Sequence, residues 1–156
     1  MVFKLMRFFG AIALLGVGVV HLQQYYGADY SGVPTIGPLF LLNGIGSGIL
    51  GVTLLLPIER LVKGRSRDAA LGAVTLGGVM IAVGSLAALF ISEYGGLFGF
   101  TEPGYSLPVV LAIVAETATL FLLGPVCAVS VTRALLGRRH AAWPPVVDGR
   151  RQARYS

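Results

Sequence analysis

The sequence predicts an all-α protein, a four-helix transmembrane bundle whose N-terminus and C-terminus are both cytoplasmic. Apolar residues make up 55% of the 156 residues and charged residues only 12%, about half the share of roughly 25% that is usual in soluble domains. The mean hydropathy is +0.80. A soluble domain of this size needs a charged surface that this composition does not provide. Lipid is therefore expected around most of the protein.

Four apolar stretches carry the helix prediction, at residues 5–24, 36–56, 69–92 and 107–134. Each is near or above the roughly 20 residues that cross a hydrocarbon core of about 30 Å. Each must be helical, because a lipid-exposed backbone satisfies its N–H and C=O groups only within a helix or a closed barrel. Residues 1–137 are thus predicted to form one transmembrane domain. Residues 138–156 form a basic, proline-interrupted tail that we expect to be poorly ordered.

The positions of the basic residues orient the predicted helices. All twelve Lys and Arg residues precede or begin the first stretch, lie between the second and third, or end and follow the fourth. The two opposite connections, residues 25–35 and 93–106, contain none. The positive-inside rule then places both termini in the cytoplasm of a multi-pass protein of the bacterial plasma membrane. This topology explains the net charge of +5, so the bilayer is the expected partner and nucleic acid is not.

The first predicted helix has one alternative interpretation, a cleaved signal peptide. Lys4 and Arg7 precede an apolar run that ends at Val20, and this order is typical of a signal sequence. No A-x-A cleavage pattern follows the run, and Tyr25 and Tyr26 are typical of a helix end at the membrane interface. We therefore expect the helix to be retained. Cleavage would leave three helices in the same orientation.

Glu116 is the most informative polar residue. It lies eight residues past Pro108, which places it about 12 Å into the fourth helix from its outer end. An ionisable side chain at this depth is costly and must face the bundle or a cavity. Two interpretations stay open: a carboxylate that binds a ligand, a cation or a proton, and a protonated Glu that is hydrogen-bonded to a neighbouring helix.

Two further polar residues lie in the outer half of the membrane, on two other helices. Asn43 is about 10 Å and His21 about 6 Å from the outer interface. Taken singly, Asn43 is explained by an interhelical hydrogen bond, and His21 by an interfacial hydrogen bond to a loop carbonyl. Together with Glu116 they predict a ligand-binding pocket that opens outward. The predicted site consists of Glu116, Asn43 and His21, with Gln24, Tyr25 and Tyr26 at its mouth.

Small residues follow one face of the second helix. Gly44 and Gly48 form a GxxxG pair, and Gly51 follows one turn later. Such a face lets two helix backbones approach closely in lipid. The pattern predicts close packing within the bundle, and it is also compatible with a homo-oligomer interface through these three residues.

Several kinds of site are absent from the sequence pattern. The second histidine, His140, lies in the cytoplasmic tail, so His21 and His140 are predicted on opposite sides of the membrane and cannot both ligate one haem. No metal-type Cys/His spacing and no established catalytic motif occurs. The single cysteine, Cys127, is interpreted as a small buried hydrophobe. No cofactor, metal site or catalytic residue is therefore predicted.

One segment resembles a known pattern. The run HLQQYYGADYSGVPTIGPLFLLNGIGSGILG resembles small four-helix integral membrane proteins of high-GC Gram-positive bacteria, in which a His near the end of helix one precedes a Tyr-rich loop and a PTIG-LFLLN-like entry to helix two. The resemblance covers residues 10 to about 56. The topology and glycine content are also similar to those of DoxX-like proteins. The resemblance implies the same four-helix fold and carries no activity with it.

Three functions are compatible with the sequence. The first is a non-enzymatic accessory or oligomerising subunit, alone or within a larger membrane complex. It is favoured because glycine faces are present and catalytic motifs are absent. The second is a small-molecule or proton-linked binding or transport protein that uses the outer polar pocket. The third, least favoured, is a membrane enzyme or quinone-linked redox component.

Overall fold

The computed structural model describes residues 1–63, 65–101 and 104–142, and these are helical except at their connections. Four helices are long and apolar enough to cross a membrane, which confirms the predicted all-helical, four-span architecture. Among the described residues no strand forms, and only an isolated bridge joins Leu97 and Phe100. The elements are α1 (Val2–Gly27), the 3₁₀ turn η1 (Tyr30–Gly32), α2 (Ile36–Leu55), the short α3 (Ile58–Leu61), α4 (Arg65–Tyr94) and α5 (Leu107–Ala142).

The helices extend beyond the predicted apolar stretches. α1 and α4 begin and end a few residues outside them, because Lys, Arg and Glu at these ends are good helix formers once the helix leaves the lipid. α5 passes through Pro125 and continues to Ala142, which takes it into the segment that was expected to be a poorly ordered tail. Residues 143–156 of that predicted tail lie outside the described residues.

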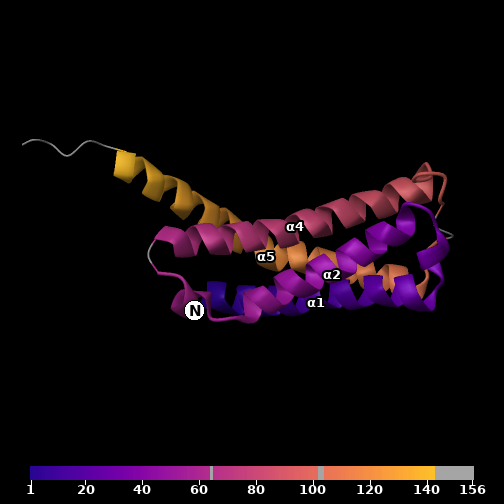
Figure 1. The fold of residues 1–156 in the computed structure, drawn as a ribbon, viewed down its shortest axis with the longest axis horizontal. Coiled ribbons are helices and arrows are strands. Elements are labelled where there is room, and N and C mark those ends of the chain that lie inside the picture. Colours follow the sequence, from indigo (N-terminus) through magenta and orange to yellow (C-terminus); the bar gives the residue numbers. More distant parts are fainter. Residues whose placement is uncertain (64, 102–103, 143–156) are drawn as a thin grey trace, which may run out of the picture.

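The four long helices form an elongated bundle (Figure 1). α1 packs against α2 and α5, α4 packs against α5, and α2 and α4 make a smaller contact. The α1–α2 and α4–α5 connections lie at one end, here called the loop end. The N-terminus, the α2–α4 connection and the end of α5 lie at the other (Figure 1).

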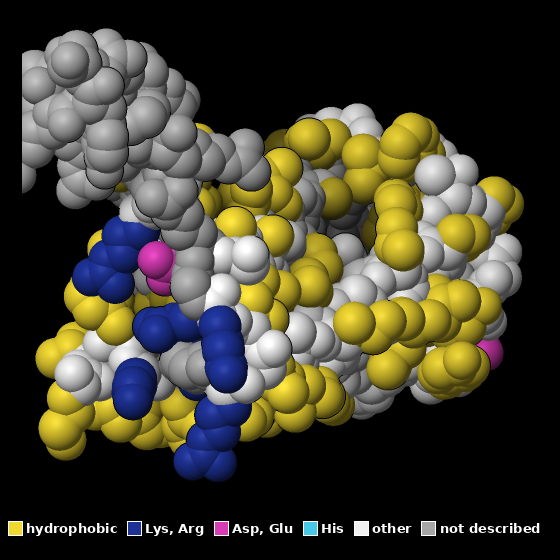
Figure 2. All heavy atoms as spheres, turned by 60° about the vertical axis from the view of Figure 1, so that its left-hand side comes forward, with side chains coloured by type: hydrophobic (Ala, Val, Ile, Leu, Met, Phe, Trp, Pro, Cys, Tyr) yellow, Lys and Arg dark blue, Asp and Glu magenta, His cyan; other side chains and the backbone are white. Residues whose placement is uncertain are grey.

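Basic side chains gather at this second end, here called the basic end, whereas apolar side chains cover most of the remaining visible surface (Figure 2). The described segments at the basic end are the start of α1, the α2–α4 connection, the start of α4 and the C-terminal part of α5. They contain Lys4, Arg7, Arg60, Lys63, Arg67 and Arg133. The segregation of charge that was read from the sequence is therefore also a segregation in space.

The packed core lies between the middle of the bundle and the basic end. Ala11, Leu14, Leu54 and Leu123 form one cluster with no exposed surface. Helices in lipid gain little from the hydrophobic effect and associate through close van der Waals packing. The bundle reaches that packing by bringing side chains of one helix over small residues of the next.

The glycine face of α2 contributes to this packing. A Cβ atom at Gly44 would lie 2.6 Å from Leu22, and one at Gly51 would lie 2.8 Å from Leu15. Both leucines belong to α1 of the same chain, so these two glycines already face a partner inside the bundle. A Cβ atom at Gly48 would meet nothing within 4 Å.

At the loop end, a tight connection fixes η1 over the bundle. Asp29 and Thr35 have positive φ angles of 59° and 66°, which turn the chain between α1 and α2. A Cβ atom at Gly37 would lie 2.5 Å from the Tyr30 carbonyl oxygen, so only glycine permits this approach. The connection therefore holds Tyr30 close to the start of α2.

Candidate functional site

A cavity lies inside the loop half of the bundle, between all four long helices and the α4–α5 connection. The volume open to the centre of a water molecule is about 90 Å³. One buried water needs roughly 10–15 Å³ on this measure, so the cavity has room for several waters or a small organic molecule. Most of its wall is apolar. Its polar lining consists of His21, Gln24, Asn43, Ser85, Ser92 and Glu116.

His21 is held by hydrogen bonds at both ring nitrogens. Its Nδ1 lies 2.9 Å from the Val17 carbonyl oxygen, one helical turn back on α1. A carbonyl only accepts hydrogen bonds, so Nδ1 carries a proton. Its Nε2 lies 3.0 Å from Ser85 Oγ on α4. In the neutral imidazole, Nε2 is thus the acceptor and the Ser85 hydroxyl is the donor. This pair of bonds fixes the ring orientation across two helices.

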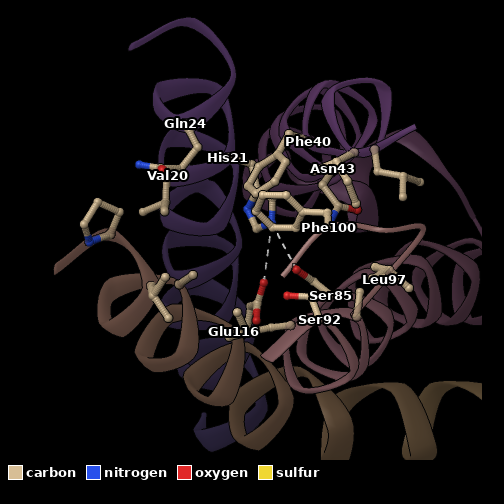
Figure 3. A pocket seen from close by; sticks show the side chains of 17 residues that line it. Val20, His21, Gln24, Phe40, Asn43, Ser85, Ser92, Leu97, Phe100 and Glu116 are labelled. Atoms are coloured by element: carbon tan, nitrogen blue, oxygen red, sulfur yellow. Dashed lines mark hydrogen bonds and ion pairs between the residues drawn. The ribbon is translucent and has the colours of Figure 1, made fainter. Parts of the chain in front are cut away.

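Glu116 on α5 lies on the same side of the imidazole as Ser85. Its Oε1 is 3.7 Å from His21 Nε2, and Figure 3 shows Glu116 and Ser85 approaching His21 from two different helices. The residue is 1% exposed. Neither carboxyl oxygen has a hydrogen-bond partner among the described residues. Buried polar atoms nearly always have a hydrogen-bond partner. The carboxyl oxygens of Glu116 are therefore the part of the cavity wall that can bind a polar group of a ligand.

Three aromatic rings stand at the loop end of the cavity. Phe40 packs against His21 with ring centroids 5.2 Å apart. Tyr30 stacks on Phe40 at 5.0 Å and meets Phe100 edge-on at 5.5 Å. Phe40 and Phe100 also line the cavity. The rings therefore form an apolar cover between the polar wall and the connections at the loop end.

The three residues predicted to form an outer polar pocket lie around this one cavity. His21 from α1 and Glu116 from α5 come close together, and Asn43 lines the α2 wall. Among the described residues, Asn43 makes no hydrogen bond to His21 or Glu116. Gln24, expected at the mouth, also lines the cavity.

The structure places Tyr25 and Tyr26 differently from this expectation, since neither is among the described residues that line the cavity. α1 continues as a helix to Gly27, which rotates Tyr26 roughly 140° away from His21. Tyr26 is 72% exposed, and Tyr25 packs edge-on against it at 4.8 Å. Tyr30 takes the position near the cavity instead.

Sequence reasoning missed the two serines of α4. Ser85 and Ser92 are seven residues apart, which places them on one face of a helix, and both line the cavity. Serine is common in membrane helices as a packing residue, so neither stands out alone. The seven-residue spacing of these serines was the sequence feature that could have identified them as cavity residues.

The geometry differs from that of a Ser-His-Asp triad. In a Ser-His-Asp triad the carboxylate bonds to Nδ1 of the histidine and the serine to Nε2. Here the Val17 carbonyl oxygen accepts the hydrogen bond from His21 Nδ1. Both Ser85 and Glu116 lie near His21 Nε2. Structural and catalytic zinc sites need three or more protein ligands, and no cluster of three His, Cys, Asp or Glu side chains is found in the part of the chain that the structure describes.

Residues 10–56 are predicted from sequence to resemble small membrane proteins of high-GC Gram-positive bacteria, and this stays a prediction. No family model, no curated protein and no solved structure matches the chain.

Proposed function

We propose that this chain is a multi-pass protein of the bacterial plasma membrane that binds a small, mostly apolar molecule in the cavity at its loop end. The observation that carries the proposal is the buried Glu116 carboxyl, whose two oxygens face a cavity without any hydrogen-bond partner among the described residues. Binding sites are mostly apolar cavities with a few placed polar groups. His21, Ser85 and Asn43 are the other polar groups in this site.

The basic end is proposed to face the cytoplasm, with both termini inside. The gathering of Lys and Arg side chains there supports this orientation through the positive-inside rule (Figure 2). The loop end, which carries the cavity, then faces outward. The ligand site would lie in the outer half of the membrane.

The sequence alone favoured an accessory or oligomerising subunit. That proposal depended on the glycine face of α2, and Gly44 and Gly51 pack on α1 of the same chain. Such packing accounts for two of the three glycines without a second copy. The cavity, in contrast, brings together His21 and Glu116, two buried ionisable groups that the packing of helices does not require. The binding function is therefore the better supported of the two.

A pair of neighbouring alanines provides the test. Ala88 lines the cavity, and Ala87, one residue earlier on α4, is exposed on the outer surface of the helix. We expect Ala88→Phe to fill the cavity and Ala87→Phe to leave it open. Binding of benzyl alcohol to the purified full chain in detergent, measured by ligand-observed NMR, should persist in Ala87→Phe and fall by at least about tenfold in affinity in Ala88→Phe.

The comparison between the two variants removes the contribution of benzyl alcohol that merely dissolves in the micelle. Circular dichroism and the melting temperature of each variant establish that both are folded. Equal binding by the two folded variants would reject the proposed function.

A further inference from the structure

We infer that the ligand of this cavity is a lipophilic organic cation, a molecule with a primary or secondary ammonium group on a small apolar body. The inference rests on the proposed function and specifies the class of molecule that the same site takes. It follows from the charges that face the cavity, the hydrogen-bonding capacity left on its walls, and the aromatic rings that surround it.

The ionisable residues that line the cavity give it a negative or a zero net charge when Glu116 is ionised. Among the described lining residues, His21 and Glu116 are ionisable and none is Lys or Arg. α1 contributes His21 and α5 contributes Glu116, whereas α2 and α4 contribute only neutral polar groups, from Asn43, Ser85 and Ser92. An anionic ligand would therefore meet a carboxyl group without a fixed cation to balance it. A cationic ligand would meet its natural counter-charge.

The polar atoms without a hydrogen-bond partner also favour a cationic ligand. Both nitrogens of His21 have partners, namely Val17 and Ser85. The two oxygens of Glu116 have none among the described residues. A carboxylate accepts hydrogen bonds and donates none, and an ammonium group supplies two or three N–H donors with no acceptor. Charge-assisted bonds of this type are about twice as strong as bonds between neutral groups.

The aromatic rings suit the apolar body of such a ligand. Phe40 and Phe100 line the cavity, and Phe40 lies against the His21 ring. Aromatic rings pack favourably against one another in offset or edge-to-face arrangements. An ammonium group at Glu116 would leave the apolar body of the ligand to pack against the aromatic part of the cavity wall.

Three probes of similar size separate this inference from the general binding function. Benzylamine is an ammonium ion at neutral pH, benzyl alcohol is neutral and benzoate is an anion. We expect the wild-type chain, purified in detergent, to bind benzylamine at least about tenfold more tightly than benzyl alcohol, and benzoate more weakly still. Glu116→Gln should remove the preference for the amine while benzyl alcohol still binds, which also shows that the variant is folded.

Two further variants complete the design. Glu93→Gln, on α4 and not among the cavity-lining residues, should keep the preference for the amine. Phe100→Leu should weaken benzylamine and benzyl alcohol to a similar extent, by a few-fold at most, because it removes an aromatic face that packs on the ring of either probe and keeps the apolar volume. These measurements do not depend on Glu116→Gln being stable.

The outcomes distinguish the two proposals. If benzyl alcohol binds as tightly as benzylamine, or if Glu116→Gln keeps the preference, the cation inference is wrong and the binding function stands. If none of the three probes binds the folded wild-type chain, both proposals are wrong.

Discussion

The two halves of this bundle use the same four helices in different ways. Toward the basic end the helices close on a dry cluster that includes Leu14 and Leu123, with no exposed surface. Toward the loop end they enclose a cavity with a buried His, Ser and Glu on its wall. The comparison teaches that the buried His and Glu side chains among the described residues, His21 and Glu116, lie together at the cavity. The polar side chains buried elsewhere, such as Thr75, Thr119 and Ser130, carry only hydroxyl groups.

The difference has a local cause in residue size. Around the packed cluster, small residues such as Gly10, Gly51 and Gly78 sit under the side chains of a neighbouring helix. Around the cavity, bulky rings stand between the helices. Phe40 packs on His21 and Tyr30. The helices thus approach closely around the cluster and stand apart around the cavity.

The largest expected effect comes from truncating a side chain in the packed half. Leu123→Ala should lower the free energy of unfolding by about 2–4 kcal/mol, because neighbouring helices cannot collapse fully into the space. Leu89→Ala removes the same atoms from the cavity wall and should cost about 1 kcal/mol or less. Reversible unfolding in mixed micelles would measure both. Equal losses would mean that the two halves are packed alike.

A smaller effect is expected from the glycines. Gly44→Ala places a Cβ atom 2.6 Å from Leu22 and should cost about 1–3 kcal/mol through overpacking. Gly84→Ala meets nothing within 4 Å, so it should be neutral or slightly stabilising through its gain in helix propensity. Thermal unfolding of the two variants makes the comparison. If Gly84→Ala were the more harmful, its open surface would have to be a contact with another chain.

Substitution of Glu116 should raise the stability of the protein, whereas substitution of the core residues should lower it. Glu116→Gln replaces a buried carboxyl that has no hydrogen-bond partner with a neutral group of the same shape. We expect a gain of about 1 kcal/mol in the free energy of unfolding, because binding sites are often retained at a cost in stability. Glu93→Gln, in a partly exposed position at the end of α4, should change stability by less than about 0.5 kcal/mol. A clear loss of stability in Glu116→Gln would indicate a structural role instead.

The sequence predicts the spans well because the bilayer leaves few alternatives. A backbone in lipid must be helical, and its length is set by the hydrocarbon thickness. The same constraint makes His21 and Glu116 conspicuous, since ionisable groups in a membrane helix face the bundle interior. Both were expected to share a pocket, and both line one cavity.

The rest of the site depends on features that hydropathy does not encode. Ser85 is one small residue among many, and its role depends on the rotation of α4 about its axis. The aromatic cover depends on the connection between α1 and α2, which turns at Asp29 and Thr35, two non-glycine residues with positive φ. Such conformations are uncommon outside glycine. The position of Tyr30, and the exclusion of Tyr26, could therefore not be read from the sequence.

The most direct test of an open cavity at the loop end and close packing toward the basic end uses two serines that are equally buried. Ser92 and Ser130 are each 4% exposed. Ser92 lines the cavity, and Ser130 lies on α5 toward the basic end. In a Cys127→Ala background, Ser92→Cys and Ser130→Cys each place one thiol at a matched depth of burial.

The rate at which a small methanethiosulfonate reagent modifies each thiol is the deciding measurement. Modification requires access to the thiolate, and a close-packed thiol reacts only when the structure opens locally. The account predicts that Ser92→Cys reacts at least about tenfold faster than Ser130→Cys and is protected by benzylamine. Equal rates, or a faster reaction at Ser130→Cys, would contradict it.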